Sequence, residues 1–133
     1  MYPQILRRTH NWQYKAEFED NYIEMIKSFR NLASAPSVWI CYPVPAYPGR
    51  WGISDKTIKN EVMPLIEKAA AKTDVKIIDL YTALSNKAEL FRDKIHPNAE
   101  GAGIMAKTIA AVITGKSLPA KVVPRMSGKE QGK

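Results

Sequence analysis

The chain has 133 residues, about the size of one domain. Hydrophobic residues make up 45% of it and charged residues 25%, a balance that excludes a chain disordered throughout and a collagen-like repeat. Its apolar runs are far shorter than the roughly 18 residues of a membrane-spanning helix, so we expect no membrane partner. Cys41 is the single cysteine, so no internal disulfide is expected. Because only two histidines are present besides it, no zinc framework is expected either. No other metal or cofactor is indicated. The composition does not fix a cellular compartment.

The net charge of +7 is concentrated near the C-terminus. Positions 116–133 hold five basic residues and one acidic residue, whereas positions 1–115 hold 15 basic and 12 acidic residues. The sequence therefore predicts one globular unit over 1–115 and a basic, disordered tail over 116–133. Because no aromatic residue is interleaved with the charges of the tail, it offers no stacking platform for a single strand, and no nucleic-acid partner is expected.

A helical pattern follows Asn11. We expect Asn11 to cap this helix and Pro36 to stop it, so that it ends between Leu32 and Ala35. Aromatic and aliphatic residues recur there at spacings of three and four, with charged residues between them: Tyr14, Phe18, Tyr22, Met25, Ile26 and Phe29.

A strand and a second helix come next, joined by a loop rich in proline and glycine. The run over 38–42 is apolar at every position, which is typical of a strand buried on both faces of a parallel sheet. We therefore expect Trp39 and Cys41 to belong to the core, Cys41 as an inert thiol. The second helix is expected from a cap at Ser54 or Asp55 to about Lys72, with a kink at Pro64.

The second strand is predicted over 75–80, followed by a largely polar connection to Asn98. A last helix, capped by Asn98, is expected over 99–113 with these apolar residues turned inward: Ile104, Met105, Ile109, Val112 and Ile113. Alternating helices and strands predict an α/β fold with parallel strands. Two strands leave both edges of the sheet open, so the chain is expected to belong to something larger or to pair with another copy.

The sequence Asp93-Lys94-Ile95-His96 on the last loop is the strongest chemical signal. A carboxylate three residues before a histidine can reach its Nδ1 atom, hold its tautomer and stabilise the imidazolium while Nε2 acts as a general base. The alternative is structural: Asp93 and Asn98 cap the following helix, and His96 is their exposed neighbour.

These residues resemble the last motif of the SGNH/GDSL hydrolases. The resemblance spans roughly 11–113, and is carried by Asp93-x-x-His96-Pro97-Asn98-x-Glu100-Gly101, Val44-Pro45-Ala46-Tyr47, the segment 60–66 and Ile78-Asp79-Leu80. It implies a flavodoxin-like three-layer α/β/α sandwich that hydrolyses acyl or acetyl esters, including those of carbohydrates. It also implies that His96 is the general base and Asp93 its orienter.

The chain also departs from that family. The Gly-Asp-Ser motif with the nucleophile and the Gly-x-Asn-Asp motif of the oxyanion hole are both missing, and Lys94 stands where the family often has glycine. The sequence is therefore interpreted as the C-terminal half of such an enzyme. Without a nucleophile and oxyanion donors, His96 and Asp93 cannot form an acyl-enzyme, so weak or no esterase activity is expected from this chain alone.

Other side chains are weaker candidates. Tyr47 and Trp51 lie on the loop after the first strand and could line an acyl or sugar crevice, so both are proposed to bind substrate. Asp79 ends the second strand, and a capping role is favoured over a place in the crevice. His10 has no carboxylate close in sequence and is expected at the surface.

Two functions follow from these observations. The first is an ester hydrolase of the SGNH type, represented by its C-terminal half, whose partner is a small acyl ester. The second is a non-catalytic α/β module that acts by self-association or by binding a partner through its open sheet edge, which would make it a homo-oligomer.

Overall fold

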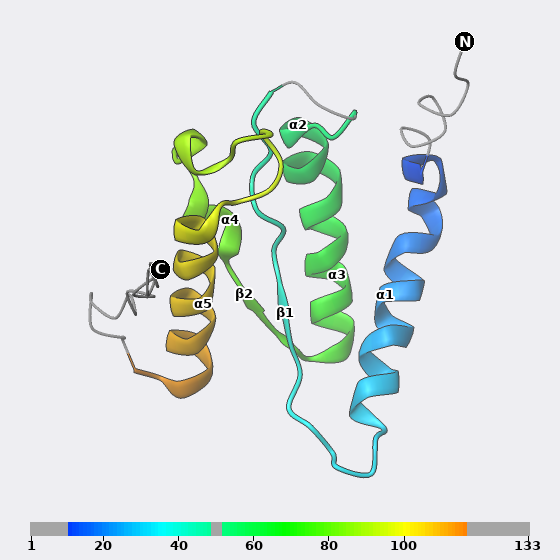
Figure 1. The fold of residues 1–133 in the computed structure, drawn as a ribbon. Coiled ribbons are helices and arrows are strands. Elements are labelled where there is room, and N and C mark those ends of the chain that lie inside the picture. Colours follow the sequence, from blue (N-terminus) through cyan, green and yellow to red (C-terminus); the bar gives the residue numbers. More distant parts are fainter. Residues whose placement is uncertain (1–10, 49–51, 117–133) are drawn as a thin grey trace, which may run out of the picture.

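The structure, a computed structural model, describes residues 11–48 and 52–116 (Figure 1). The predicted tail therefore lies outside the described residues, apart from Lys116. The chain order is a 3-10 turn Asn11–Tyr14, α1 Lys15–Arg30, β1 Trp39–Cys41, α2 Asp55–Thr57, a π-helical turn Ile58–Val62, α3 Met63–Thr73, β2 Lys76–Ile78, α4 Leu80–Leu84, a 3-10 turn Ala88–Leu90 and α5 Ala99–Thr114.

The two strands are parallel, which confirms the predicted α/β class. Ile40 pairs with Ile77 and Cys41 with Ile78, and the backbone N–H of Tyr42 continues the ladder by donating to Ile78 O at 3.0 Å. Each strand is three residues long, shorter than predicted. Because side chains alternate between faces along a strand, Ile40 and Ile77 point to one side and Ile78 to the other.

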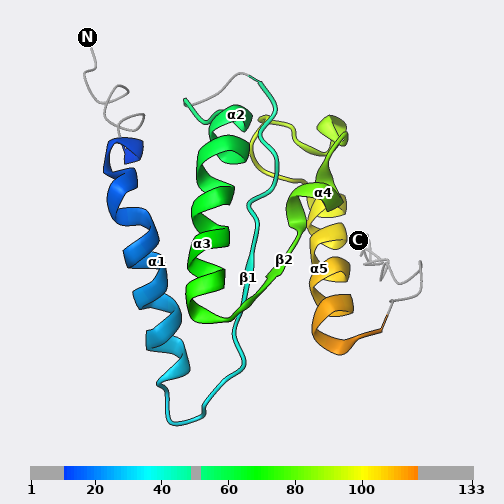
Figure 2. The same cartoon turned by 180° about the vertical axis from the view of Figure 1, so that it is seen from behind.

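Helices cover both sides of this strand pair, as a partial three-layer sandwich requires. Ile40 packs with residues of α1, α3 and the start of β2 in one core cluster: Ile26, Ile66, Ala70 and Val75. Helix α5 contacts β2, and Figures 1 and 2 show the strands between α3 and α5. Trp39 and Cys41 are only half-buried, so their predicted place in a fully covered core is wrong; the sheet has no further strand in the described ranges.

Helix α1 differs from its prediction at both ends and on its apolar face. It begins after a 3-10 turn without a side-chain cap, and it ends at Arg30, where the N–H of Asn31 donates to Lys27 O. Ile23 and Ile26 are buried, whereas Met25 and Phe29 are 45% and 54% exposed. The apolar face of α1 therefore includes more residues than the rest of the described structure buries.

The second helix changes geometry just before Pro64, the residue at which the sequence predicts a kink. The chain widens into the π-helical turn Ile58–Val62 immediately before it, and Pro64 lies in the first turn of α3. A proline lacks the N–H of a regular helical bond and its ring crowds the carbonyl four residues earlier, so a wider turn at this point accommodates it. The predicted cap at Ser54 is confirmed, since its Oγ accepts from the N–H of Thr57.

The connection predicted to be polar contains a second core. Helix α4 and a 3-10 turn bury three residues between them, Leu84, Leu90 and Phe91, each at most 5% exposed. Ile104 and Met105 of α5 pack against this cluster. The elements were missed because each is five residues or shorter, too short to show a helical period.

Helix α5 confirms its predicted start, because Asn98 Oδ1 accepts from the N–H of Gly101 at 3.0 Å. The inward placement of its last apolar residues is wrong: Val112 and Ile113 are 43% and 50% exposed. Over the described part of the chain, no helix combines the length and apolar character needed to cross a membrane.

Candidate active site

The loop from Phe91 to Asn98 is closed on itself and joined to β1. Its ends meet where Asn98 N donates to Leu90 O at 2.7 Å, and Lys94 N donates to Phe91 O at 3.1 Å. Lys94 has a φ of 72°, a left-handed conformation that glycine adopts without cost and lysine adopts rarely. Its carbonyl accepts from the N–H of Tyr47 at 2.8 Å, which fixes the loop to the segment after β1.

Asp93 and His96 are brought together within this loop. Asp93 Oδ2 lies 2.6 Å from His96 Nδ1, and Asp93 Oδ1 accepts from the backbone N–H groups of Ile95 and His96 at 3.0 and 2.7 Å. Asp93 therefore fills a structural and a chemical role at once: one oxygen closes the turn and the other holds the imidazole. Of the two residues predicted to cap α5, Asp93 and Asn98, it is Asn98 that does so.

The electrostatics of the loop keep Asp93 ionised. The backbone N–H of His96 is the largest influence that lowers the pKa of the Asp93 carboxyl below its ordinary value of 3.8, followed by the imidazole and the N–H of Ile95. With a carboxylate on Nδ1, the neutral imidazole carries its proton there and presents Nε2 as the basic atom. His96 is 71% exposed, so this atom belongs to a ring that a substrate can reach.

The turn into α5 depends on a glycine. A side-chain carbon at Gly101 would lie 2.7 Å from Cβ of Pro97, closer than carbon atoms approach, and 3.6 Å from Cβ of Leu90. Pro97 follows His96 directly, so the absence of a side chain at Gly101 lets the loop that carries Asp93 and His96 lie against the first turn of α5.

Tyr47 is held by the fold around it. Its hydroxyl donates to Leu84 O at 2.7 Å and accepts from the N–H of Lys87 at 2.9 Å, and its ring lies 4.9 Å from that of Phe91. Tyr47 also lines a cavity. Its contact with substrate stays a prediction. Trp51 and His10 lie outside the described residues.

Two further candidates have structural surroundings. Asp79 caps α4, accepting from the N–H of Thr82 at 2.8 Å and from its hydroxyl at 2.7 Å, which confirms the capping role. Cys41 is half-buried, and burial raises the pKa of its thiol, so little of the nucleophilic thiolate forms.

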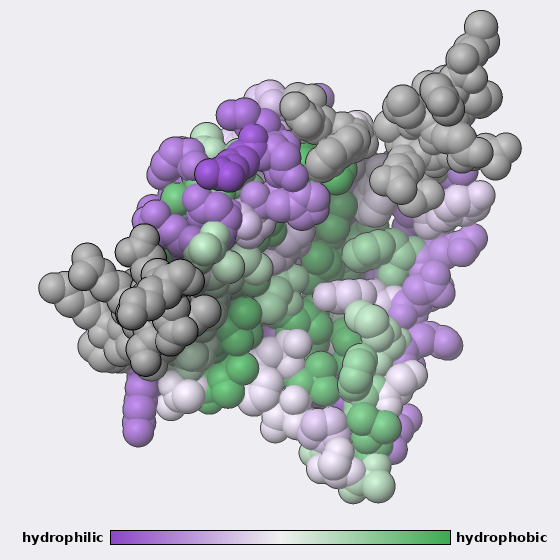
Figure 3. Space-filling view, in the orientation of Figure 1, coloured by the Kyte–Doolittle hydropathy of each residue, from purple (hydrophilic) through white to green (hydrophobic). Residues whose placement is uncertain are grey.

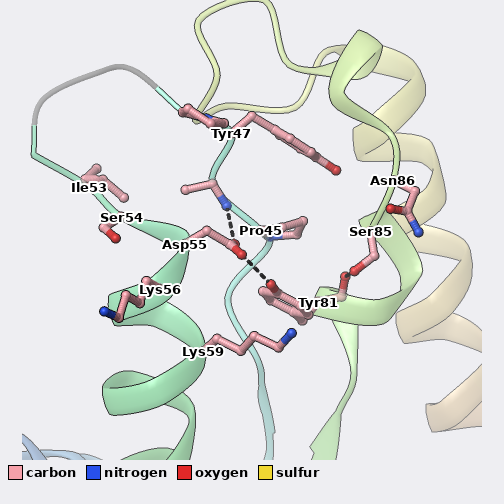
Figure 4. A pocket seen from close by; sticks show the side chains of 12 residues that line it. Pro45, Tyr47, Ile53, Ser54, Asp55, Lys56, Lys59, Tyr81, Ser85 and Asn86 are labelled. Atoms are coloured by element: carbon pink, nitrogen blue, oxygen red, sulfur yellow. Dashed lines mark hydrogen bonds between the residues drawn. The ribbon is translucent and has the colours of Figure 1, made fainter.

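The structure adds a cavity that sequence reasoning missed. It opens between α2 and α4 at the C-terminal end of β1, with a volume of about 710 Å³ (Figure 4). Asp55 connects the segment after β1 to α4 across this cavity. It accepts from the N–H of Ala46 at 3.0 Å and from the hydroxyl of Tyr81 at 2.7 Å. Burial, and then the Asp55 carboxylate, raise the pKa of Tyr81 to about 12. The sequence indicated Asp55 only as an alternative helix cap, because its partner Tyr81 lies 26 residues away.

No group of three or more His, Cys, Asp or Glu side chains within 11–48 and 52–116 is arranged to hold a metal ion. The arrangement at Asp93 and His96 instead supplies an oriented base. Such a base can take a proton from a hydroxyl or a water, but it supplies neither a nucleophile nor oxyanion donors.

Comparison with known proteins shows what this chain is similar to in fold and in sequence. No protein-family model matches the chain. A solved structure, the esterase domain of the ORF1 protein from a zebrafish retrotransposon, superposes with a TM-score of 0.62 at 18% identity over 77% of this chain and 60% of that one. At this level of identity the likeness concerns the fold alone, and it confirms the predicted α/β fold of the chain.

Sequence similarity then points to a particular relative. The chain is 35% identical to an acetylxylan esterase of Xylanibacter ruminicola, over 80% of this chain. The aligned part is 26% of the relative, so the chain spans about a quarter of its length. The last motif indicated a resemblance to an esterase. The similarity to part of the acetylxylan esterase confirms this resemblance.

Gly101→Ala tests the close approach of Pro97. We expect this substitution to destabilise the fold by about 1–3 kcal/mol, because the new methyl group must displace the loop. Gly103→Ala is the matched control: nothing lies within 4 Å of its added carbon, so we expect about 0.5–1 kcal/mol of stabilisation from the better helix former. Urea denaturation measures both, and a Gly101→Ala variant as stable as the control would contradict the close packing.

A carbon-13 NMR titration tests the hydrogen bonds of Asp93. We expect its carboxyl to titrate below 3.8, and in His96→Ala to titrate higher yet still below that value, since two backbone N–H groups remain. Because the folded pKa is lowered, the stabilisation by this carboxylate is complete above the unfolded pKa and is lost as the pH falls through the folded one. An ordinary midpoint in the native chain would refute the arrangement.

Proposed function

We propose that this chain is the C-terminal part of an SGNH-type ester hydrolase, with His96 as the general base and Asp93 as its orienter. The observation that carries the proposal is the 2.6 Å contact between Asp93 Oδ2 and His96 Nδ1, with the carboxylate held by two backbone donors. The similarity to an acetylxylan esterase supports acetyl esters of carbohydrates as the substrate class.

The proposed reaction uses His96 twice. Nε2 takes the proton of a serine hydroxyl as the oxygen attacks the ester carbonyl, and then gives this proton to the departing alkoxide. Asp93 holds Nδ1–H and stabilises the imidazolium between these steps. In this proposal the serine and the oxyanion donors come from outside this chain, which covers 60% of the zebrafish domain.

Three of the five serines within the described ranges have other hydrogen-bonding roles. Ser28 Oγ donates to Glu24 O, Ser54 Oγ accepts at the start of α2, and Ser85 Oγ donates to Tyr81 O. Alone, the chain is therefore expected to act through His96 on water and an activated ester, without an acyl-serine intermediate.

Hydrolysis of 4-nitrophenyl acetate tests this function on the chain as it exists. We expect slow turnover that falls at least about tenfold in His96→Ala, because general-base catalysis is lost. His10→Ala is the matched control, as it removes the only other histidine, and we expect it to leave the rate unchanged. A rate that is equal in native chain and His96→Ala would refute the role of His96.

Labelling with a fluorophosphonate completes the test. We expect no covalent adduct in the intact mass of the native chain. A single adduct that disappears in His96→Ala would show that a serine of this chain is activated, and the proposal that the nucleophile lies elsewhere would be wrong.

The open edge of β1 favours a second candidate function, association with another copy of the chain. Tyr42 N–H points to β2, and N–H groups alternate sides along a strand, so the N–H of Cys41 faces the edge opposite β2. A groove beside the start of this strand is lined by Phe29, Val38 and Trp39 among others. Apolar side chains also gather across the face between the α5 and α1 sides in Figure 3.

Sedimentation equilibrium tests this association. We expect a concentration-dependent dimer in which the β1 edges pair, and Phe29→Lys should weaken it by placing a charge beside that edge. Val112→Lys, at a similarly exposed apolar position on α5, serves as the matched control. A chain that stays monomeric throughout the concentration range would count against self-association and leave the edge to the missing part of the domain.

A further inference from the structure

The cavity between α2 and α4 is connected through Tyr47 to the loop that carries Asp93 and His96. Its volume of about 710 Å³ falls within the range of about 300–1,000 Å³ typical of small-molecule sites. Tyr47 forms part of its wall, and the N–H of Tyr47 donates to the carbonyl of Lys94, between Asp93 and His96. Tyr47 therefore connects the wall of the cavity to the segment that carries the proposed general base.

Asp55 makes one wall of this cavity rigid. Its two oxygens bind groups from different segments, the N–H of Ala46 after β1 and the hydroxyl of Tyr81 in α4. A carboxylate oxygen has more than one lone pair, so each can accept a further hydrogen bond from a ligand hydroxyl. The aromatic rings of Tyr47 and Tyr81 line the same space and offer apolar surface.

The charges of the cavity select against a charged ligand. Figure 4 shows the Lys59 amine directed toward Tyr81, beside the Asp55 carboxylate, whereas the Lys56 side chain is directed away. An anion would meet Asp55 and a cation would meet Lys59, so the two balance each other. On the opposite wall, Asn86 supplies an amide that both donates and accepts.

We propose that this cavity is a subsite for the neutral carbohydrate part of the ester. A sugar ring presents hydroxyls that donate and accept together with an apolar C–H face, and the cavity offers partners for both. The inference rests on the proposed ester hydrolase function, and it adds where the glycan chain lies: against Asp55, Lys59, Tyr81 and Asn86, on the β1 side of the catalytic loop.

An NMR titration of the full chain with xylotetraose tests the subsite. We expect saturable shifts of the backbone amides of Ala46, Asp55 and Asn86. Lys59→Met and Asn86→Gly should each weaken binding by about tenfold, since each removes a polar partner. Glycine suits position 86 because Asn86 has a φ of 60°, and the exposed Lys68→Met on α3 is the matched lysine control, expected to bind like the native chain.

Three results would overturn the subsite. One is the absence of saturable shifts, and another is binding that is unaffected by both Lys59→Met and Asn86→Gly. The third is tighter binding of glucuronate than of xylotetraose, which would show that the cavity selects an anion. The titration contains no ester, so its failure is distinguishable from a failure of His96-dependent hydrolysis.

Discussion

Tyr47 ties the loop that carries Asp93 and His96 to the end of β1. Its ring packs on Phe91, its hydroxyl bonds to the backbone of Leu84 and Lys87, and its own N–H bonds to the carbonyl of Lys94. Because a buried Tyr hydroxyl needs partners, these bonds fix the ring in one position. Tyr47 therefore holds together the second core cluster, the loop that carries Asp93 and His96, and one wall of the cavity.

The elements with a strong local signal were predictable from the sequence. Asn98 before an amphipathic run predicts the start of α5, and the spacing of Asp93 and His96 predicts their contact because both lie on one short loop. The role of Tyr47 was not predictable in this way. Its partners Leu84 and Lys94 are distant in sequence, and the residue pattern of a single sequence does not predict contacts over such a distance.

The sequence predicted that several side chains are buried which the structure leaves partly or largely exposed, and the cause is physical. Hydrophobic periodicity indicates which side chains avoid water in the complete domain, not which neighbours this chain supplies. Trp39, Met25 and Val112 have the pattern of core residues, but the described residues leave them half-buried or exposed. The chain covers 60% of the zebrafish esterase domain that it resembles in fold.

The two oxygens of Asp93 link the order of the loop to the tautomer of His96. One oxygen closes the turn through backbone donors and the other holds the ring, all within four residues. Contacts this close in sequence cost little loop-closure entropy, whereas a serine and oxyanion donors from other segments must be brought in over long stretches of chain. The orientation of the imidazole is thus a local property of residues 93–96, whereas a nucleophile and oxyanion donors on other segments depend on the fold of the whole domain. A piece of the domain can keep the first without the second.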